Sequence, residues 1–271
     1  MRFMANSESA EELDLDIADL RILRGSVPAS TQLAEWLKAQ ILEQRLRSGS
    51  RLPSERELIL RSGLSRVTVR AAVGILEHEG WLVRRQGLGT FVAEPVKQEL
   101  ASGVRTITEV LLDSGVTPRV DVLSHGIVTP PERIARALRR PDALRIRRRY
   151  SDNNQPLALV TIYLSPDLGD AVTPLLSTDS TETTYTMWEQ RLGVRIGTAS
   201  HEIHAAGASP DVAEALDLSE GAPVLVLERT TYTVGGEPLE VVVFHHRPER
   251  YGFSMTLARE TSGPTIGMIE R

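Results

Sequence analysis

The sequence predicts an α+β protein with two domains: a small helical domain that ends in a two-stranded hairpin, and a larger domain built on an antiparallel sheet. Two patterns support this. Residues 31–92 carry helix caps, apolar residues at helical spacing and a glycine-rich turn. Beyond residue 103, apolar runs of strand length are joined by hairpin turns and interrupted by short helical segments, which is typical of an antiparallel sheet that carries helices.

The composition is that of an ordinary globular protein. The chain has 271 residues, of which 41% are hydrophobic and 25% charged, enough for two domains. It contains no cysteine, which excludes disulfides, thiolate nucleophiles and cysteine-ligated zinc. No apolar run is long enough to cross a bilayer, and the N-terminus lacks the core of a signal peptide. We therefore expect a cytoplasmic protein.

Charge divides the chain into four predicted parts. Residues 1–27 form an acidic tail with 3 basic and 6 acidic residues, and residues 28–95 form the small domain with 10 basic and 7 acidic residues. Residues 96–102 are a linker and residues 103–271 the large domain. The small domain alone has a positive net charge, so a polyanion is expected to bind there.

The first two helices of the small domain have clear signals. A helix is predicted over residues 31–46 because its apolar residues recur at i, i+4 and i+8. Ser54 and Glu57 form a capping box directly after a proline, so a second helix begins there. Gly63 supplies the left-handed conformation that ends this helix.

A third helix follows after a tight turn. Ser65 caps it, and Val69, Val73 and Leu76 form one apolar stripe up to Gly80. A basic hairpin comes next, with a turn that contains two glycines. Two short helices around a turn, followed by such a hairpin, are the layout of a winged helix-turn-helix domain, which reads DNA.

The start of the third helix offers the residue types that DNA recognition needs. Arg66, Thr68 and Arg70 lie in its first turns, and arginine is the commonest bidentate partner of a guanine edge. Hydroxyls and free amides at a helix N-terminus bind phosphate. The alternative is that these are solvated side chains, since helix-turn-helix patterns also occur in proteins that bind no DNA.

The large domain is predicted to alternate strands with short helices. Thr106 and Glu109 form another capping box, and turns are expected at residues 153–154 and 235–236. Strands are predicted over residues 120–128, 144–150, 157–164, 194–205, 224–234 and 238–246, and helices over 106–112, 131–138, 184–192 and 210–216.

Arginines cluster on one of these strands. Arg147 and Arg149 are two residues apart and therefore point to the same face of the sheet, where they would repel each other unless an anion or solvent compensates them. One interpretation is an anion site, and the other is a solvated edge that discourages aggregation. His201 and His204 are three apart on a predicted strand and so make a poor metal pair, and we predict no metal site.

The small domain resembles the DNA-binding domain of GntR-type transcription regulators through the segment LPSERELILRSGLSRVTVRAAVGILEHEGWLVRRQGLGTFV. The second half is similar to the UTRA effector-binding domain of the HutC subfamily through NNQPLALVTIYLSPDL, EALDLSEGAPVLVLERTTY and GGEPLEVVVFHHRPERY. Together the resemblance covers roughly residues 30 to 255. It implies a C-terminal domain of chorismate lyase-like fold.

The resemblance also implies functional residues. DNA contact would fall to Ser54, Arg56, Ser65, Arg66, Thr68, Arg70, Gln86, Gly87 and Gly89. The effector pocket would use Thr106, Arg147, Arg149, Thr183, Tyr185, Glu240 and His246. The sequence departs from relatives that bind phosphorylated sugars: the hydroxyls belong to threonine rather than serine, and a histidine replaces a tyrosine. An apparent extra residue near Asp152 could also shift the arginine register onto Arg148.

We therefore predict a transcription regulator, expected to be a repressor, that binds a pseudo-palindromic operator as a homodimer and associates with the nucleoid. An anionic metabolite, such as a sugar phosphate or an organic acid, would change the spacing of its two DNA-binding domains. An enzyme of the chorismate lyase type is the first alternative, but the sequence shows no acid–base constellation, and we predict neither catalysis nor a cofactor. Related aminotransferase-like regulators need a Schiff-base lysine, and only Lys97 follows the small domain. Related all-helical, metal-binding regulators lack the predicted strands.

Overall fold

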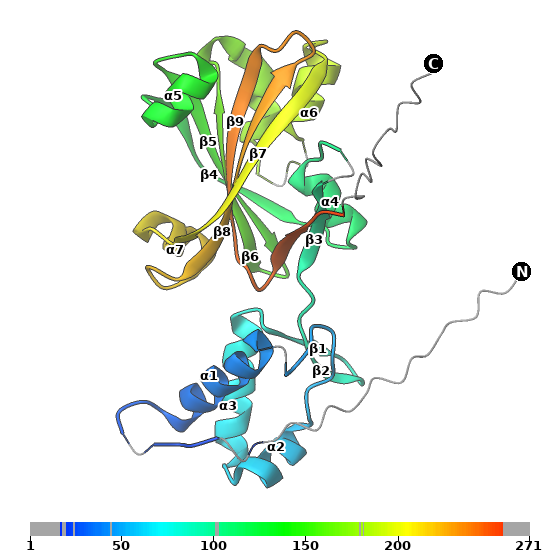
Figure 1. Cartoon of the computed structure of the whole chain (residues 1–271), viewed down its shortest axis with the longest axis vertical. Helices are drawn as coiled ribbons and strands as arrows, with labels where there is room; N and C mark the ends of the chain where they lie inside the picture. Colours follow the sequence, from blue (N-terminus) through cyan, green and yellow to red (C-terminus); the bar gives the residue numbers. More distant parts are fainter. Residues whose placement is uncertain are drawn as a thin grey trace, which may run out of the picture.

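The computed structural model describes residues 17, 20–23, 25–43, 45–100, 103–178, 180 and 182–256. It shows the two domains that the sequence predicts, one below the other in Figure 1. Most of the predicted acidic tail, residues 1–16, lies outside the described residues. In the described part, no helix combines the length and the hydropathy that crossing a membrane requires.

The N-terminal domain consists of three helices and a hairpin. These are α1 (Ala29–Leu42), α2 (Glu55–Ser62), α3 (Arg66–His78), β1 (Leu82–Arg85) and β2 (Gly89–Val92). The capping box of Ser54 and Glu57 is confirmed, and Gly63 ends α2 in the left-handed conformation with φ of 67°. Helix α1 ends four residues earlier than predicted, and Leu46 beyond it is fully buried in the domain core. Ile17, within the predicted tail, belongs to the same core.

The C-terminal domain is built on one antiparallel sheet in the order β4-β5-β6-β9-β8-β7. Its strands are β4 (Arg119–Val128), β5 (Ala143–Asp152), β6 (Gln155–Leu164), β7 (Ile196–Gly207), β8 (Pro223–Thr233) and β9 (Pro238–His246). Asn153 and Asn154 both have positive φ, as the predicted two-residue turn between β5 and β6 requires. All six predicted strands are therefore present.

Helical segments cover both faces of this sheet. One face packs against α4 (Ile107–Asp113), the 3₁₀ segment η2 (Pro166–Leu176), α6 (Thr184–Thr186) and the π-helical turn η3 (Met187–Arg191). The opposite face packs against α5 (Glu132–Leu138) and α7 (Pro210–Leu216). The sequence did not reveal η2, and the helix predicted over residues 184–192 is divided between α6 and η3.

The predicted linker contains a strand. Residues 96–99 form β3 (Val96–Glu99), which pairs in parallel with β10 (Tyr251–Ser254), the strand that follows β9. This pairing holds the segment that leaves the N-terminal domain against β10 of the C-terminal domain.

An aromatic cluster fastens β10 to the sheet. His246, the last residue of β9, stacks on Tyr251 with 4.0 Å between ring centres, and Phe244 and Phe253 flank it. The Tyr251 hydroxyl donates to Gln98 of β3 at 2.9 Å. Full burial, with a smaller contribution from neighbouring His245, lowers the pKa of His246 from 6.5 to about 3.

This buried histidine makes stability depend on pH. In the unfolded chain His246 binds a proton near pH 6.5, whereas the folded protein does not until about pH 3. The unfolded state therefore binds more protons in this window, and stability falls as pH falls, by at most about 1.4 kcal/mol per pH unit. We expect His246→Phe to flatten the pH dependence of urea unfolding between pH 6.5 and 4. The exposed His125→Phe is the control, and a wild-type slope in His246→Phe would contradict the assignment.

Candidate DNA-binding surface and ligand cavity

The first turn of α3 presents an exposed basic surface. Arg66 and Arg70 are exposed, and the Ser65 hydroxyl accepts the backbone N–H of Thr68 at 3.2 Å as the helix cap. Arg56 at the start of α2 is also exposed, and within the described residues neither it nor Arg66 makes an ion pair. These guanidinium groups are available to an external anion such as a phosphate.

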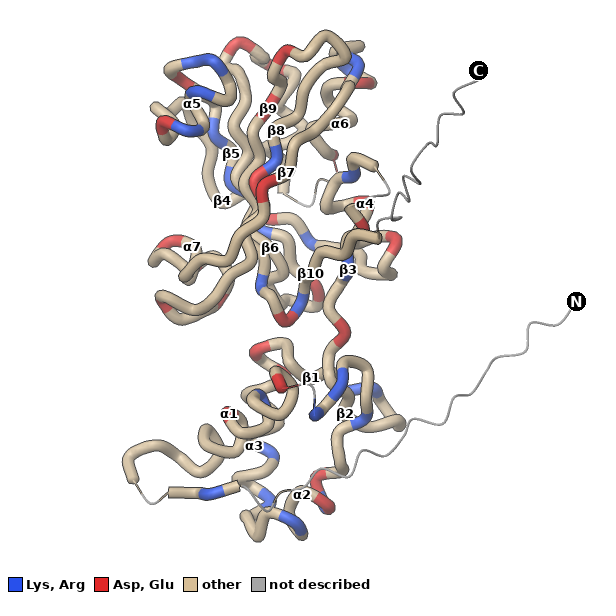
Figure 2. Tube along the Cα trace, in the orientation of Figure 1, with Lys and Arg blue, Asp and Glu red and all other residues tan. Residues whose placement is uncertain are grey.

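The hairpin forms a wing beside this surface. Its turn uses Gly87 and Gly89, with φ of 74° and 120°, and a side chain at Gly89 would lie 2.9 Å from the Arg51 guanidinium. A groove of about 460 Å³ separates the wing from the start of α2, and Gln86 also lines it. Figure 2 shows Lys and Arg on these elements of the N-terminal domain.

The groove contains cations that the sequence analysis did not select. Arg51, Arg84 and Arg85 line it together with Glu55. Glu55 lies 3.5 Å from Arg84 and 3.9 Å from Arg70, so one carboxylate orients two arginines. Both arginines are more than half exposed, and such pairs contribute little to stability. A phosphate could therefore replace the carboxylate at small cost.

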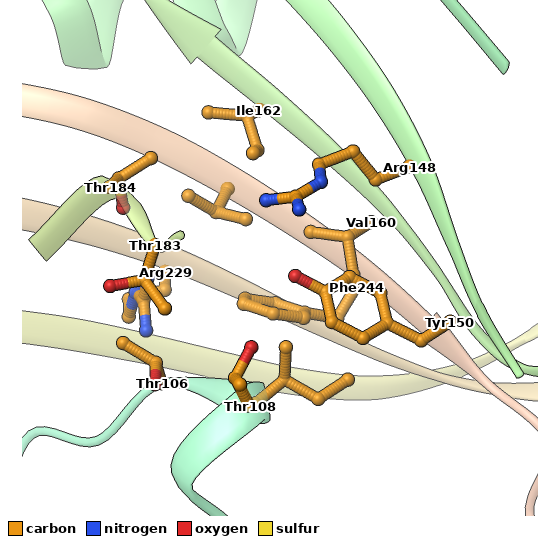
Figure 3. Close-up of a pocket in the computed structure, with 12 residues that line it drawn as sticks. Thr106, Thr108, Arg148, Tyr150, Val160, Ile162, Thr183, Thr184, Arg229 and Phe244 are labelled. Carbon is orange, nitrogen blue, oxygen red and sulfur yellow. The ribbon is translucent and has the colours of Figure 1, made fainter. Parts of the chain in front are cut away.

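A small cavity opens in the C-terminal domain between the sheet and the caps of α4 and α6 (Figure 3). Its volume is about 20 Å³, room for little more than one water. Its polar lining combines four threonines and two arginines: Thr106, Thr108, Thr183, Thr184, Arg148 and Arg229. A second, polar cavity of about 340 Å³ shares Thr183 and is lined by Tyr185 and Glu109.

The structure brings Arg148, not Arg147 and Arg149, to this cavity. Arg148 lies between Ile146 and Tyr150 on the inner face of β5 and is 1% exposed. Arg147 and Arg149 point to the opposite face, where they pair at 3.0 Å with Asp211 and Asp121. Arg148 is one residue away from each of the two arginines that the resemblance implies, and because side chains alternate along a strand, one residue reverses the face.

Among the described residues, the guanidinium of Arg148 has no acidic partner. It donates to the backbone carbonyls of Glu182 and Ser180, the first at 2.8 Å, and its Nε is buried without a hydrogen-bond partner. Carbonyl oxygens stabilise the cation only partially. A buried charge of this kind favours a nearby anion.

The second cavity arginine, Arg229, was missed by the sequence analysis. It is 3% exposed on β8, donates to Glu240 at 3.1 Å and to the Arg105 carbonyl, and lies 4.6 Å from the Tyr185 ring centre. Its Nε is also buried without a partner. A charged residue inside the apolar run of β8 was the available signal for it.

The predicted Glu240 lies behind the cavity rather than in its wall. It is fully buried and accepts hydrogen bonds from Arg229, Thr231 and Trp188 at 3.1 to 3.2 Å. Arg229 and Thr231 are two residues apart on β8 and therefore share a face, and Trp188 reaches the same carboxylate from η3. Glu240 therefore holds Arg229 in place.

The remaining predicted effector residues lie in three different places. Thr106 and Thr183 line the small cavity, where each also caps a helix, and Tyr185 lies in the adjoining one. Burial raises the pKa of Tyr185, so its hydroxyl stays protonated and can donate a hydrogen bond. His246 does not line the cavity, since it lies in the aromatic cluster at the end of β9.

Two family models match the chain. Residues 29–92 match the bacterial regulatory proteins of the gntR family, and residues 113–252 match the UTRA domain. The crystal structure of PhnF from Mycobacterium smegmatis has a similar fold, with a TM-score of 0.55 and 22% identity over 85% of this chain and 99% of that one.

Curated relatives are regulators. The chain is 70% identical to the HTH-type transcriptional regulator Rv0792c of Mycobacterium tuberculosis, over 96% of this chain and 97% of that protein. It is 31% identical to the HTH-type transcriptional repressor NagR of Bacillus subtilis, covering 84% and 93% of the two chains. It is 33% identical to the histidine utilization repressor of Pseudomonas aeruginosa, covering 77% and 84%. The chain belongs to the GntR family, in its HutC-type branch with a UTRA domain, and is a DNA-binding transcription regulator rather than an enzyme.

Proposed function

We propose that this regulator is a homodimeric repressor whose operator affinity is set by a small anionic metabolite bound at Arg148 and Arg229. The observation that carries the proposal is that two almost fully buried guanidinium groups line one cavity, each with an Nε that lacks a partner. The repressor role is supported by NagR and the histidine utilization repressor, which are named as repressors. Such a protein would act in the cytoplasm, at the nucleoid.

DNA would be bound by the N-terminal domain, residues 28–95, and the metabolite by residues 103–271. In the N-terminal domain, the start of α3 would enter the major groove, with Arg66 and Arg70 near base edges. Arg56, the helix-cap hydroxyls and the wing would hold phosphates on either side. Because helix-turn-helix proteins read two half-sites as symmetric dimers, the operator would be pseudo-palindromic.

The charge balance of the cavity favours an anion. Arg229 is compensated by Glu240, but among the described residues Arg148 has only carbonyl hydrogen-bond partners and the Tyr150 ring, so the described lining has one uncompensated positive charge. Threonine hydroxyls beside the arginines can donate to phosphate or carboxylate oxygens. The small cavity would have to widen toward the larger one to admit a sugar phosphate or an organic acid. Binding of the metabolite and of DNA would be coupled reciprocally.

The first test concerns base recognition by Arg70. We expect Arg70→Ala to lose about 1–3 kcal/mol of affinity for the best-bound fragment of the genome, while binding to scrambled duplex changes little. Fluorescence anisotropy titrations at fixed salt would measure both. Arg136→Ala, exposed on α5 of the other domain, is the matched control. Equal weakening on both duplexes would show that Arg70 only contacts phosphate.

The second test uses two neighbouring arginines that point to opposite faces. Arg148→Met should abolish the heat of binding of sugar phosphates or organic acids in calorimetry, because it removes the uncompensated charge from the cavity. Arg147→Met is the control and should retain binding, since Arg147 pairs with Asp211 on the far face. Unchanged operator binding would show that Arg148→Met is folded. Anion binding that survives in Arg148→Met but not in Arg147→Met would reverse the assignment.

A further inference from the structure

One arginine connects the two domains. Arg247 directly follows β9, and its side chain is 2% exposed although it lies at the domain boundary. It donates through Nε to Glu249 at 2.6 Å, through Nη1 to the Leu216 carbonyl at 3.4 Å, and through Nη2 to the Glu79 carbonyl. Glu79 belongs to the N-terminal domain, 168 residues away in the sequence.

Both carbonyls lie at the C-terminal ends of helices. Glu79 is the C-cap of α3, the helix proposed to enter the DNA groove, and Leu216 is the last residue of α7. Such carbonyls lack partners within their helices and carry partial negative charge, so a guanidinium is a favourable neighbour. One buried cation therefore holds the ends of two helices that belong to different domains.

The rest of the boundary is not a packed core. A cavity of about 590 Å³ lies beside Arg247, between Trp81 of the N-terminal domain and Leu218 of the C-terminal domain. The nearby pair of His78 and Asp217 is more than half exposed on both sides, so it contributes little. Among the described residues, the angle between the domains thus depends on a few polar contacts, and the bond from the buried Arg247 side chain to the Glu79 carbonyl is one of them.

Glycine at residue 80 permits the close approach of the domains. Gly80 follows the cap of α3 with φ of 82°, and a side chain there would lie 2.8 Å from the Arg250 side chain. Arg250 is itself paired with Asp152 at 3.2 Å. The segment 247–250 therefore contacts the end of α3 at two points.

The same segment continues directly from the ligand cavity. Val242 and Phe244 of β9 form part of the cavity wall, and Glu240 on this strand holds Arg229. Arg247 follows at the end of the strand, before β10 pairs with β3. A shift of β9 would therefore move the guanidinium that holds α3.

We propose that Arg247 is a positioning residue that fixes the orientation of α3 relative to the C-terminal domain and passes movements of β9 to it. This rests on the proposed operator binding and ligand control. Its effect is on orientation and not on contact with DNA, because Arg247 is buried at the end of α3 opposite to the proposed groove-binding turn. Arg247 should matter only on an operator to which both DNA-binding domains of a dimer bind at the same time.

The test compares two duplexes without any metabolite: the best palindromic fragment selected from random duplexes, and the same fragment with one half-site scrambled. In Arg247→Met, affinity for the half-site should be unchanged, whereas affinity for the palindrome should fall about tenfold, because the second domain is no longer held at the right angle. Arg136→Met, an exposed arginine with a partner in its own helix, should behave as wild type on both.

Hydrogen exchange provides a readout that needs no DNA. The backbone amides of Glu79, Gly80 and Trp81, which donate within the last turn of α3, should exchange faster in Arg247→Met than in Arg136→Met. The proposal would be overturned if Arg247→Met lost the same affinity on both duplexes or on neither, because the ratio of the two affinities would then be unchanged. If selection enriches no fragment, the proposed operator binding fails instead, and unchanged exchange at these amides would separately refute the role of Arg247.

Discussion

The C-terminal domain is organised around the cost of burying guanidinium groups. Arg148, Arg229 and Arg247 are each at most 3% exposed, and a buried guanidinium group is costly unless polar groups compensate it. Each must therefore find oxygen atoms inside the protein. Arg229 donates to the carboxylate of Glu240, and Arg247 donates to Glu249 and to the carbonyls at two helix ends. Within the described residues, Arg148 donates only to two backbone carbonyls and also lies over the Tyr150 ring. The least compensated of the three lies in the cavity, which is why that cavity is the ligand site we propose.

In the N-terminal domain arginine has the opposite role. Arg56, Arg66 and Arg70 are exposed, and the carboxylate nearest to Arg70 lies at 3.9 Å. Water already solvates these cations, so exchanging it for phosphate costs little and releases counterions. In the functions that we propose, the same residue type would serve DNA binding where it is exposed and ligand binding or domain orientation where it is buried. Burial, and not residue identity, distinguishes these roles.

Strand β9 and the segment after it connect the proposed ligand cavity to the end of α3. Strand β9 contributes to the cavity wall, and the segment after it contacts the end of α3 before β10 pairs with β3. His246 and Tyr251 stack within this segment, and Arg247 makes a polar contact at the domain boundary. A displacement of β9 would therefore act on the polar contact at its end.

Local signals in the sequence were sufficient for most of the helices and strands, but not for η2, β3 and β10. The caps at Ser54, Ser65 and Thr106 and the turn at Asn153 depend on residues within four positions of one another, so the sequence alone determined where these helices and this hairpin begin. The exposed residues of α3 followed from the same periodicity. The strand β3 was missed because its partner, β10, lies more than 150 residues away and only the fold brings the two together.

Tertiary structure decided which face of the sheet a side chain occupies and how deeply that side chain is buried. Four arginines within five residues of β5 look alike in sequence, and one residue of register determined that Arg148, and not Arg147 or Arg149, enters the cavity. His246 lies away from the cavity because it stacks on Tyr251 of β10, a strand that no local pattern in the sequence indicated. Helix caps and turns are settled by near neighbours along the chain. Which side of a sheet a charge occupies, and how far it is from water, depends on the pairing of distant strands.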